Sequence, residues 1–147
     1  MEFNEKIGAI QQQLSGKTNI GVTRRQAILK ELSLEKGQTI VDIGCGGGHL
    51  VEEISLSIGA DGKAIGVDTS EFQINSAIEK CKHLSNVEFL CCNANAVTIE
   101  DSSCDSVTFT QTLEYIDKID EVLKEGGNKA NLIASKKVKE MKKIIGF

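Results

Sequence analysis

The stretch of sequence that decides the fold reads Ile40-Val41-Asp42-Ile43-Gly44-Cys45-Gly46-Gly47-Gly48-His49-Leu50. A run of β-branched apolar residues stops at four glycines within five positions, and apolar residues with helical spacing then follow as far as Ile58. This order predicts a strand, a tight turn and a helix. A glycine turn at the start of a helix allows the backbone to approach a nucleotide closely.

The composition is that of one globular domain. The chain has 147 residues, of which 40% are hydrophobic and 26% charged. No apolar run is long enough for a transmembrane helix, and the first residues do not resemble a signal peptide, so we expect a cytoplasmic protein. The net charge is −4, although residues 129–147 carry +5. This balance favours neither a nucleic-acid nor a membrane partner.

Helices and strands are expected to alternate along most of the chain. The expected elements are, in order, helices over 3–14 and 20–34, a strand over 39–43, a helix to about 58, a strand over 64–68, a helix over 71–84, strands over 86–91 and 105–110, and a helix over 113–124. This alternation predicts an α/β fold with a parallel sheet and right-handed crossovers.

The second helix is expected to turn Ala27, Ile28, Leu29 and Leu32 inward, with Thr23 as a possible N-cap. The helix over 71–84 is expected to be capped at its N-terminus by residues 69–71, where Ser70 is the best capping residue.

The acid in the glycine stretch narrows the choice of ligand. Asp42 stands two residues before Gly44, whereas the dinucleotide-binding fingerprint lacks this acid and ends on a glycine where this chain has His49. The lysine of a phosphate-binding P-loop is also absent. A carboxylate at a strand end can face the cationic end of a ligand, and the glycines let the backbone approach it. This arrangement suits a ligand with an amino-acid moiety.

Residues 41–48 resemble the first motif of the class I S-adenosylmethionine-dependent methyltransferases. Residues 66–70 resemble the second motif, with Asp68 placed 26 residues after Asp42. In that family this acid accepts both ribose hydroxyls, a bidentate contact. The third motif, usually Asp-Ala, is Asn93-Ala94 here, and the resemblance implies that Asn93 accepts the adenine amine through its amide oxygen.

The resemblance extends from residue 22 to about residue 125. Residues 24–26 and 36–37 are similar to one large subgroup of small-molecule methyltransferases, and Gln111 follows the fourth strand at the position that faces cofactor and substrate. The resemblance implies a Rossmann-like sheet and S-adenosyl-L-methionine as cofactor. The cofactor-binding residues that it implies are Asp42, Gly44, Cys45, Gly46, Gly48, Asp68, Thr69, Asn93, Ala94 and Gln111.

The chain departs from the family pattern after residue 127. The family has seven strands, whereas the residues beyond Gly126-Gly127 supply at most one short strand, so we expect an incomplete sheet of four or five strands and a C-terminal truncation. We expect one domain over 1–147, with an N-terminal helix over 1–21, a cofactor-binding core over 22–125 and a basic tail over 126–147. The open edge of the strand at 105–110 predicts self-association.

The expected reaction is methyl transfer from S-adenosylmethionine to a small-molecule acceptor that the sequence does not identify. The protein would mainly supply proximity and orientation, so the sequence indicates no particular catalytic residue. The main alternative is a truncated, non-catalytic chain that binds cofactor weakly or serves as an interaction partner. A nucleotide-dependent oxidoreductase is a weaker alternative, because the dinucleotide fingerprint fails.

The five cysteines show neither metal-ligand spacing nor a disulfide pattern, which predicts free thiols and no metal site. Two alternatives remain open at reactive side chains. Cys91-Cys92 fits a catalytic or arsenic-binding thiol, since arsenic methyltransferases use cysteines, but also two small core residues. His49 fits a general base, but also a histidine that only lies beside the cofactor.

Overall fold

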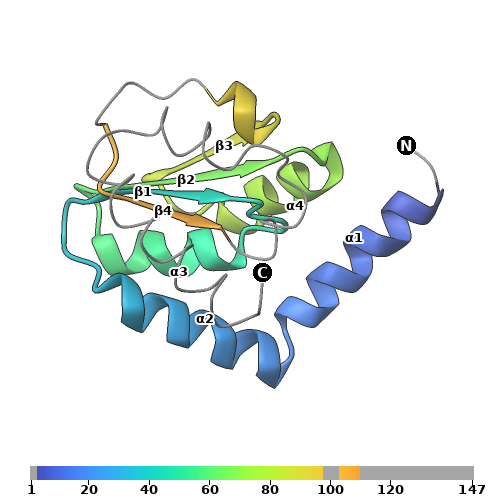
Figure 1. The fold of residues 1–147 in the computed structure, drawn as a ribbon, viewed down its shortest axis with the longest axis horizontal. Coiled ribbons are helices and arrows are strands. Elements are labelled where there is room, and N and C mark those ends of the chain that lie inside the picture. The colour runs from blue at the N-terminus through green and yellow to red at the C-terminus, as the bar shows by residue number, and fades with distance from the viewer. Residues whose placement is uncertain (1–2, 98–102, 110–147) are drawn as a thin grey trace, which may run out of the picture.

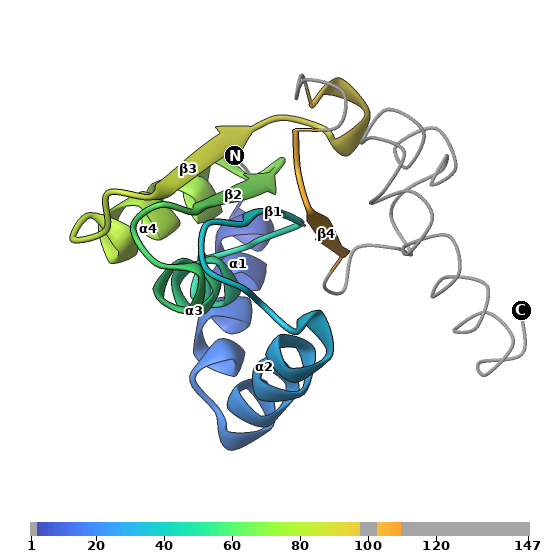
Figure 2. The same cartoon turned by 90° about the vertical axis from the view of Figure 1, so that its left-hand side faces the viewer.

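The computed structural model describes residues 3–97 and 103–109, and these form a parallel sheet whose helices lie below it in Figure 2. The elements, shown in Figure 1, are α1 (Phe3–Gly16), α2 (Asn19–Leu32), β1 (Thr39–Ile43), α3 (His49–Ile58), β2 (Lys63–Asp68), α4 (Glu71–Cys81), β3 (Val87–Cys91), the 3-10 turn η1 (Ala94–Ala96) and β4 (Ser106–Phe109). Within the described residues, the expected order of helices and strands and the α/β fold are therefore confirmed.

The second helix begins earlier than the sequence suggested. Thr23 was expected as its N-cap, and this is wrong: the cap is Thr18, whose Oγ1 accepts a hydrogen bond of 3.2 Å from the N–H of Gly21. Only Lys17 and Thr18 separate α1 from α2, so the helix starts at Asn19 and encloses Thr23. Ala27 was expected inside and is exposed, whereas Ile28, Leu29 and Leu32 pack against the core as expected.

The helix after β2 ends at Cys81, three residues before its expected end. The expected cap of that helix is confirmed, because Ser70 Oγ accepts from the N–H of Gln73.

The strands run in the order β3-β2-β1-β4, and every pairing is parallel. Their carboxyl ends therefore meet at one edge of the sheet, where open α/β sheets bind ligands. β4 ends the sheet in the part of the chain that is described. The expected helix over 113–124, the basic tail and any neighbour of β4 among residues 110–147 lie outside it.

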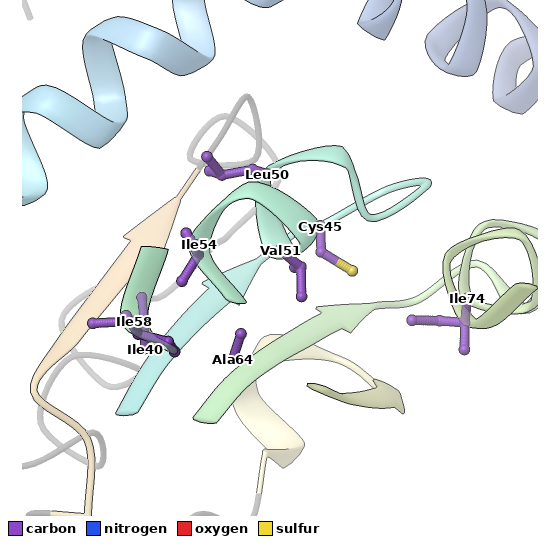
Figure 3. Close-up of a cluster of buried hydrophobic side chains, with 8 residues drawn as sticks. All are labelled: Ile40, Cys45, Leu50, Val51, Ile54, Ile58, Ala64 and Ile74. Carbon is purple, nitrogen blue, oxygen red and sulfur yellow. The ribbon is translucent and has the colours of Figure 1, made fainter. Parts of the chain in front are cut away.

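The core is split between the two faces of the sheet. On one face, Ile40 of β1 and Ala64 of β2 pack with the buried side of α3, as Figure 3 shows. On the other face lie Val41, Ile43, Ile65 and Val67. Residues alternate between the faces because successive side chains of a strand point in opposite directions. A central strand with both faces buried holds the following turn in a fixed position.

Candidate functional site

The glycine turn joins β1 to α3 and folds back over the end of β2. The N–H groups of Gly44 and Cys45 both donate to the carbonyl of Val67, at 2.7 and 3.0 Å. Gly48 has a φ of +75°, and a Cβ at this position would lie 2.8 Å from the Cβ of Ala77 on α4. Only glycine satisfies both the left-handed conformation and this close approach. The turn therefore contacts both β2 and α4, which fix its position.

Asp68, the last residue of β2, ties two turns together. Its Oδ2 accepts from the N–H of Gly46 and its Oδ1 from the N–H of Ser70, each at 2.9 Å. A carboxylate has about four acceptor positions, so both oxygens keep capacity for another donor. Asp68 thus shapes the glycine turn and the start of α4 while presenting its carboxylate at the edge of the sheet.

Asp42 is held in a different way. It lies on β1 directly beside Thr108 of β4, and the hydroxyl of Thr108 donates to its Oδ1 at 2.7 Å. The side chains are almost fully buried, with exposed fractions of 1% for Asp42 and 8% for Thr108. Burying a carboxylate is costly unless hydrogen bonds stabilise it. Thr108 supplies one such bond from the neighbouring strand.

Cys45 lies in the turn between the two acids. Burial, followed by the negative charges of Asp42 and Asp68, raises the pKa of its thiol far above the usual range. The thiol is therefore protonated at neutral pH and is not a nucleophile. Its side chain belongs to the core cluster around α3 (Figure 3).

Two neighbouring arginines of α2 border the turn. Arg25 donates from Nε to Glu53 Oε1 of α3 at 2.8 Å and from Nη1 to the carbonyl of Gly16 at 2.6 Å. It thereby holds the end of α1 against α3. Arg24 is exposed and makes neither a hydrogen bond nor an ion pair within residues 3–97 and 103–109. Its guanidinium lines the same cavity as the turn and can pair with a ligand.

His49, the first residue of α3, packs between α1 and α4. A Cβ at Gly16 would lie 2.7 Å from its ring, and Lys80 Nζ lies 3.2 Å from its Nδ1. Burial lowers its pKa to about 4, and the charges of Lys80, Arg25 and Lys17 add to this effect. The ring is neutral at pH 7, with Nδ1 placed to accept from Lys80. So low a pKa makes His49 a weak general base.

These residues surround one cavity of about 470 Å³. One wall comes from the turn and the strand ends and contains five predicted site residues, Asp42, Gly44, Cys45, Gly46 and Asp68. The opposite wall comes from the end of α1 and the first turns of α2, and it includes Ser15, Gly16, Thr18, Ile20, Arg24 and Arg25. His49 also lines the cavity.

The other predicted site residues lie outside this cavity lining. Gly48 is buried against α4, Thr69 and Asn93 are exposed, and Ala94 begins η1. Gln111 lies outside the described residues. Cys91 is the last residue of β3 and Cys92 comes directly after it, so both lie at the same edge of the sheet as the site.

The sequence did not identify the wall formed by α1 or the hydroxyl of Thr108. The only local signal of the wall formed by α1 and α2 was the Arg24-Arg25 pair. Nothing in the sequence near residue 15 indicates what the end of α1 packs against.

Among the residues described, no group of three or more His, Cys, Asp or Glu side chains is arranged to hold a metal ion. None of the helices within residues 3–97 and 103–109 has the length and apolar character that crossing a membrane requires.

Residues 34–147 match a protein family described as a methyltransferase domain. The chain is also similar to the demethylmenaquinone methyltransferase of Lactococcus lactis subsp. lactis, with 37% identity over 112 residues, which cover 70% of this chain and 44% of that protein. The enzyme of the same name from Staphylococcus haemolyticus is 29% identical over 110 residues, covering 70% of this chain and 46% of that protein. The chain thus spans about half the length of the curated relatives it matches.

The fold matches solved structures as well. A SAM-dependent methyltransferase from Aquifex aeolicus aligns with a TM-score of 0.64 and 29% identity, covering 73% of this chain and 57% of that one.

Proposed function

This chain belongs to the class I S-adenosylmethionine-dependent methyltransferases, and from that premise we propose that it transfers a methyl group from this cofactor to a small-molecule acceptor. The observation that carries the proposal is the cavity at the carboxyl ends of β1 and β2, where Asp42, Asp68 and the glycine backbone meet. When bound, S-adenosylmethionine supplies an electrophilic sulfonium methyl group together with its own leaving group. The protein then has to bind, orient and exclude water.

The ribose and the amino-acid moiety of the cofactor each have a candidate partner in the cavity lining. We propose that Asp68 accepts the ribose hydroxyls, which its remaining acceptor capacity supports. Asp42 and the turn would receive the ammonium group of the amino-acid moiety, and Arg24 its carboxylate. The exposure of Arg24 and its lack of a partner within the described residues support this role.

The adenine end would lie along the edge of the sheet toward β3. The N–H of Cys92 donates to the carbonyl of Asp68 at 3.1 Å, which brings the start of the Asn93-Ala94 pair beside the second strand. This link supports Asn93, Ala94 and Thr69 as further contacts of the cofactor. Gln111 remains a predicted contact outside the described residues.

The acceptor is proposed to be a small molecule with an apolar part. Ile20 lines the cavity and is 73% exposed, and Leu14 close by on α1 is 60% exposed. Two relatives carry the name of a methyltransferase for demethylmenaquinone, and such an acceptor is consistent with apolar side chains at this wall. Self-association through β4 and the cytoplasmic location stay predictions.

Calorimetry with S-adenosylmethionine, S-adenosylhomocysteine and NAD tests the proposal. We expect the first two to bind, NAD not to bind, and Asp68→Ala to abolish binding. Asp61→Ala is the matched control, because Asp61 is exposed in the connection between α3 and β2. Binding of NAD alone, or no binding at all, would contradict the proposal. Cofactor binding without turnover of any quinone or amine acceptor would favour the non-catalytic alternative.

A further inference from the structure

A polar pair, Asp42 of β1 and Thr108 of β4, is buried on the face of the sheet that α3 covers. Asp42 shares this face with Ile40, which packs in the core cluster of α3, because residues two apart on a strand point the same way. On β4, Val107 and Phe109 pack against the cluster on the opposite face, so Thr108 alone of these three points toward Asp42. The position next to the acid is therefore occupied by a hydroxyl.

The hydroxyl has one proton to give and two acceptors within reach. The distance from Thr108 Oγ1 is 2.7 Å to Asp42 Oδ1 and 3.4 Å to the carbonyl of Val41. The bond to the carboxylate is shorter and charge-assisted, so it dominates. Threonine is also stiff about χ1, which keeps the hydroxyl aimed at Asp42 without a further cost in side-chain entropy.

Asp42 lines the cavity and Thr108 does not. We infer that Thr108 is a positioning residue: it holds the carboxylate of Asp42 oriented toward the amino-acid end of the cofactor. This inference rests on the proposed function. No described residue of β4 lines the cavity. Through Thr108, β4 would nevertheless affect the binding of the amino-acid end of the cofactor, and of that end only.

The test uses two substitutions and two ligands. Thr108→Val keeps the shape of the side chain and removes the hydroxyl, whereas Thr108→Ser keeps the hydroxyl. S-Adenosylhomocysteine carries the amino-acid moiety, and 5′-methylthioadenosine has the same adenosine part without it. Titration calorimetry of the full chain gives the dissociation constants, and thermal unfolding monitors stability.

We expect Thr108→Val to lower the affinity for S-adenosylhomocysteine by about 10-fold, as for loss of one charge-assisted hydrogen bond. The affinity for 5′-methylthioadenosine should change less than about 3-fold, and Thr108→Ser should restore the affinity for S-adenosylhomocysteine. Unchanged binding in Thr108→Val, equal losses for both ligands, or failure of the serine variant to restore binding would each overturn the inference.

A second comparison guards against misfolding of the valine variant. In an Asp42→Asn background the charge is absent, so adding Thr108→Val should cost no further affinity for S-adenosylhomocysteine. A further 10-fold loss there would contradict a role that acts through Asp42. If the wild-type chain binds S-adenosylhomocysteine and Thr108→Val binds it equally well, this inference fails while the proposed function stands.

Discussion

The ends of β1 and β2 present the same kind of side chain and hold it in opposite ways. Asp42 is buried and receives a side-chain donor from the neighbouring strand. Asp68 is half-buried and receives two backbone donors from the turns that follow β1 and β2. One carboxylate is supported by the sheet and the other supports the turns. Substitutions at the two strand ends should therefore separate ligand affinity from stability.

The contrast between Asp42 and Asp68 depends on the conformation of the turn after β1, and Gly48→Ala should distort this turn. A methyl group there would meet Ala77 at 2.8 Å in addition to the strain of a φ of +75°. We expect the free energy of unfolding to fall by about 3 kcal/mol, combining strain and overpacking. Gly37→Ala is the control, because its φ is +81° and nothing lies within 4 Å. Strain alone should cost that variant about 1 kcal/mol in urea unfolding. Equal losses in both variants would show that packing against α4 is unimportant.

Asp68→Asn tests whether the second acid belongs to the turns. An amide has a single oxygen, so one of the two backbone N–H groups loses its acceptor. We expect a loss of about 1–2 kcal/mol in the free energy of unfolding, together with weaker S-adenosylhomocysteine binding. Asp61→Asn should change neither quantity. If Asp68→Asn lowers affinity at full stability, the contrast between the two strand ends disappears.

Arg24 and Arg25 allow the same separation of ligand affinity from stability at the cavity wall formed by α1 and α2. Arg25→Ala removes both the ion pair to Glu53 and the bond to the carbonyl of Gly16, so α1 should become accessible to limited proteolysis. We expect a loss of about 1 kcal/mol in the free energy of unfolding. Arg24→Ala should leave stability and the rate of proteolysis unchanged, and it should lower the affinity for S-adenosylhomocysteine. The reverse pattern would exchange the roles assigned to the two side chains.

The smallest expected effect is a dependence of stability on pH through His49. Its pKa is about 4 in the folded chain against 6.5 as a free group, so the unfolded chain binds more protons between these values. The stability contributed by neutral His49 is present above pH 6.5 and is lost as the pH falls toward about 4. His49→Gln should flatten this part of the profile in chemical unfolding at several pH values. Because the ring is only half-buried, solvent screening keeps the effect small.

Local patterns predicted the elements of the sheet and the turn because their signals lie within a few residues. The apolar run, the glycines and Asp42 are adjacent, and Asp68 ends the next strand. The N-cap of α2 was harder, since Thr18 and Thr23 are both plausible caps and the choice depends on where α1 ends. That point is set by contacts of Gly16 with Arg25 and His49, which no local pattern reveals.

The parts of the site that escaped prediction depend on long-range contacts. Thr108 lies 66 residues from Asp42, and Arg25 lies 28 residues from Glu53. A threonine in a strand reads as an ordinary β-former until its neighbour is known to be an acid. The placement of Asn93 and Ala94 outside the cavity lining follows from η1, a short turn that the polar sequence over 93–103 did not indicate.

The position of β4 has a consequence for the order in which the sheet assembles. β1 pairs with β2 across 24 residues, from Thr39 to Lys63, but with β4 across 66, from Ile40 to Ser106. The longer loop adds only about 1 kcal/mol of closure entropy, yet non-local pairing slows folding. During synthesis the first three strands emerge well before Thr108. Until β4 pairs with β1, the carboxylate of Asp42 lacks the hydrogen bond that the hydroxyl of Thr108 donates to it in the folded sheet.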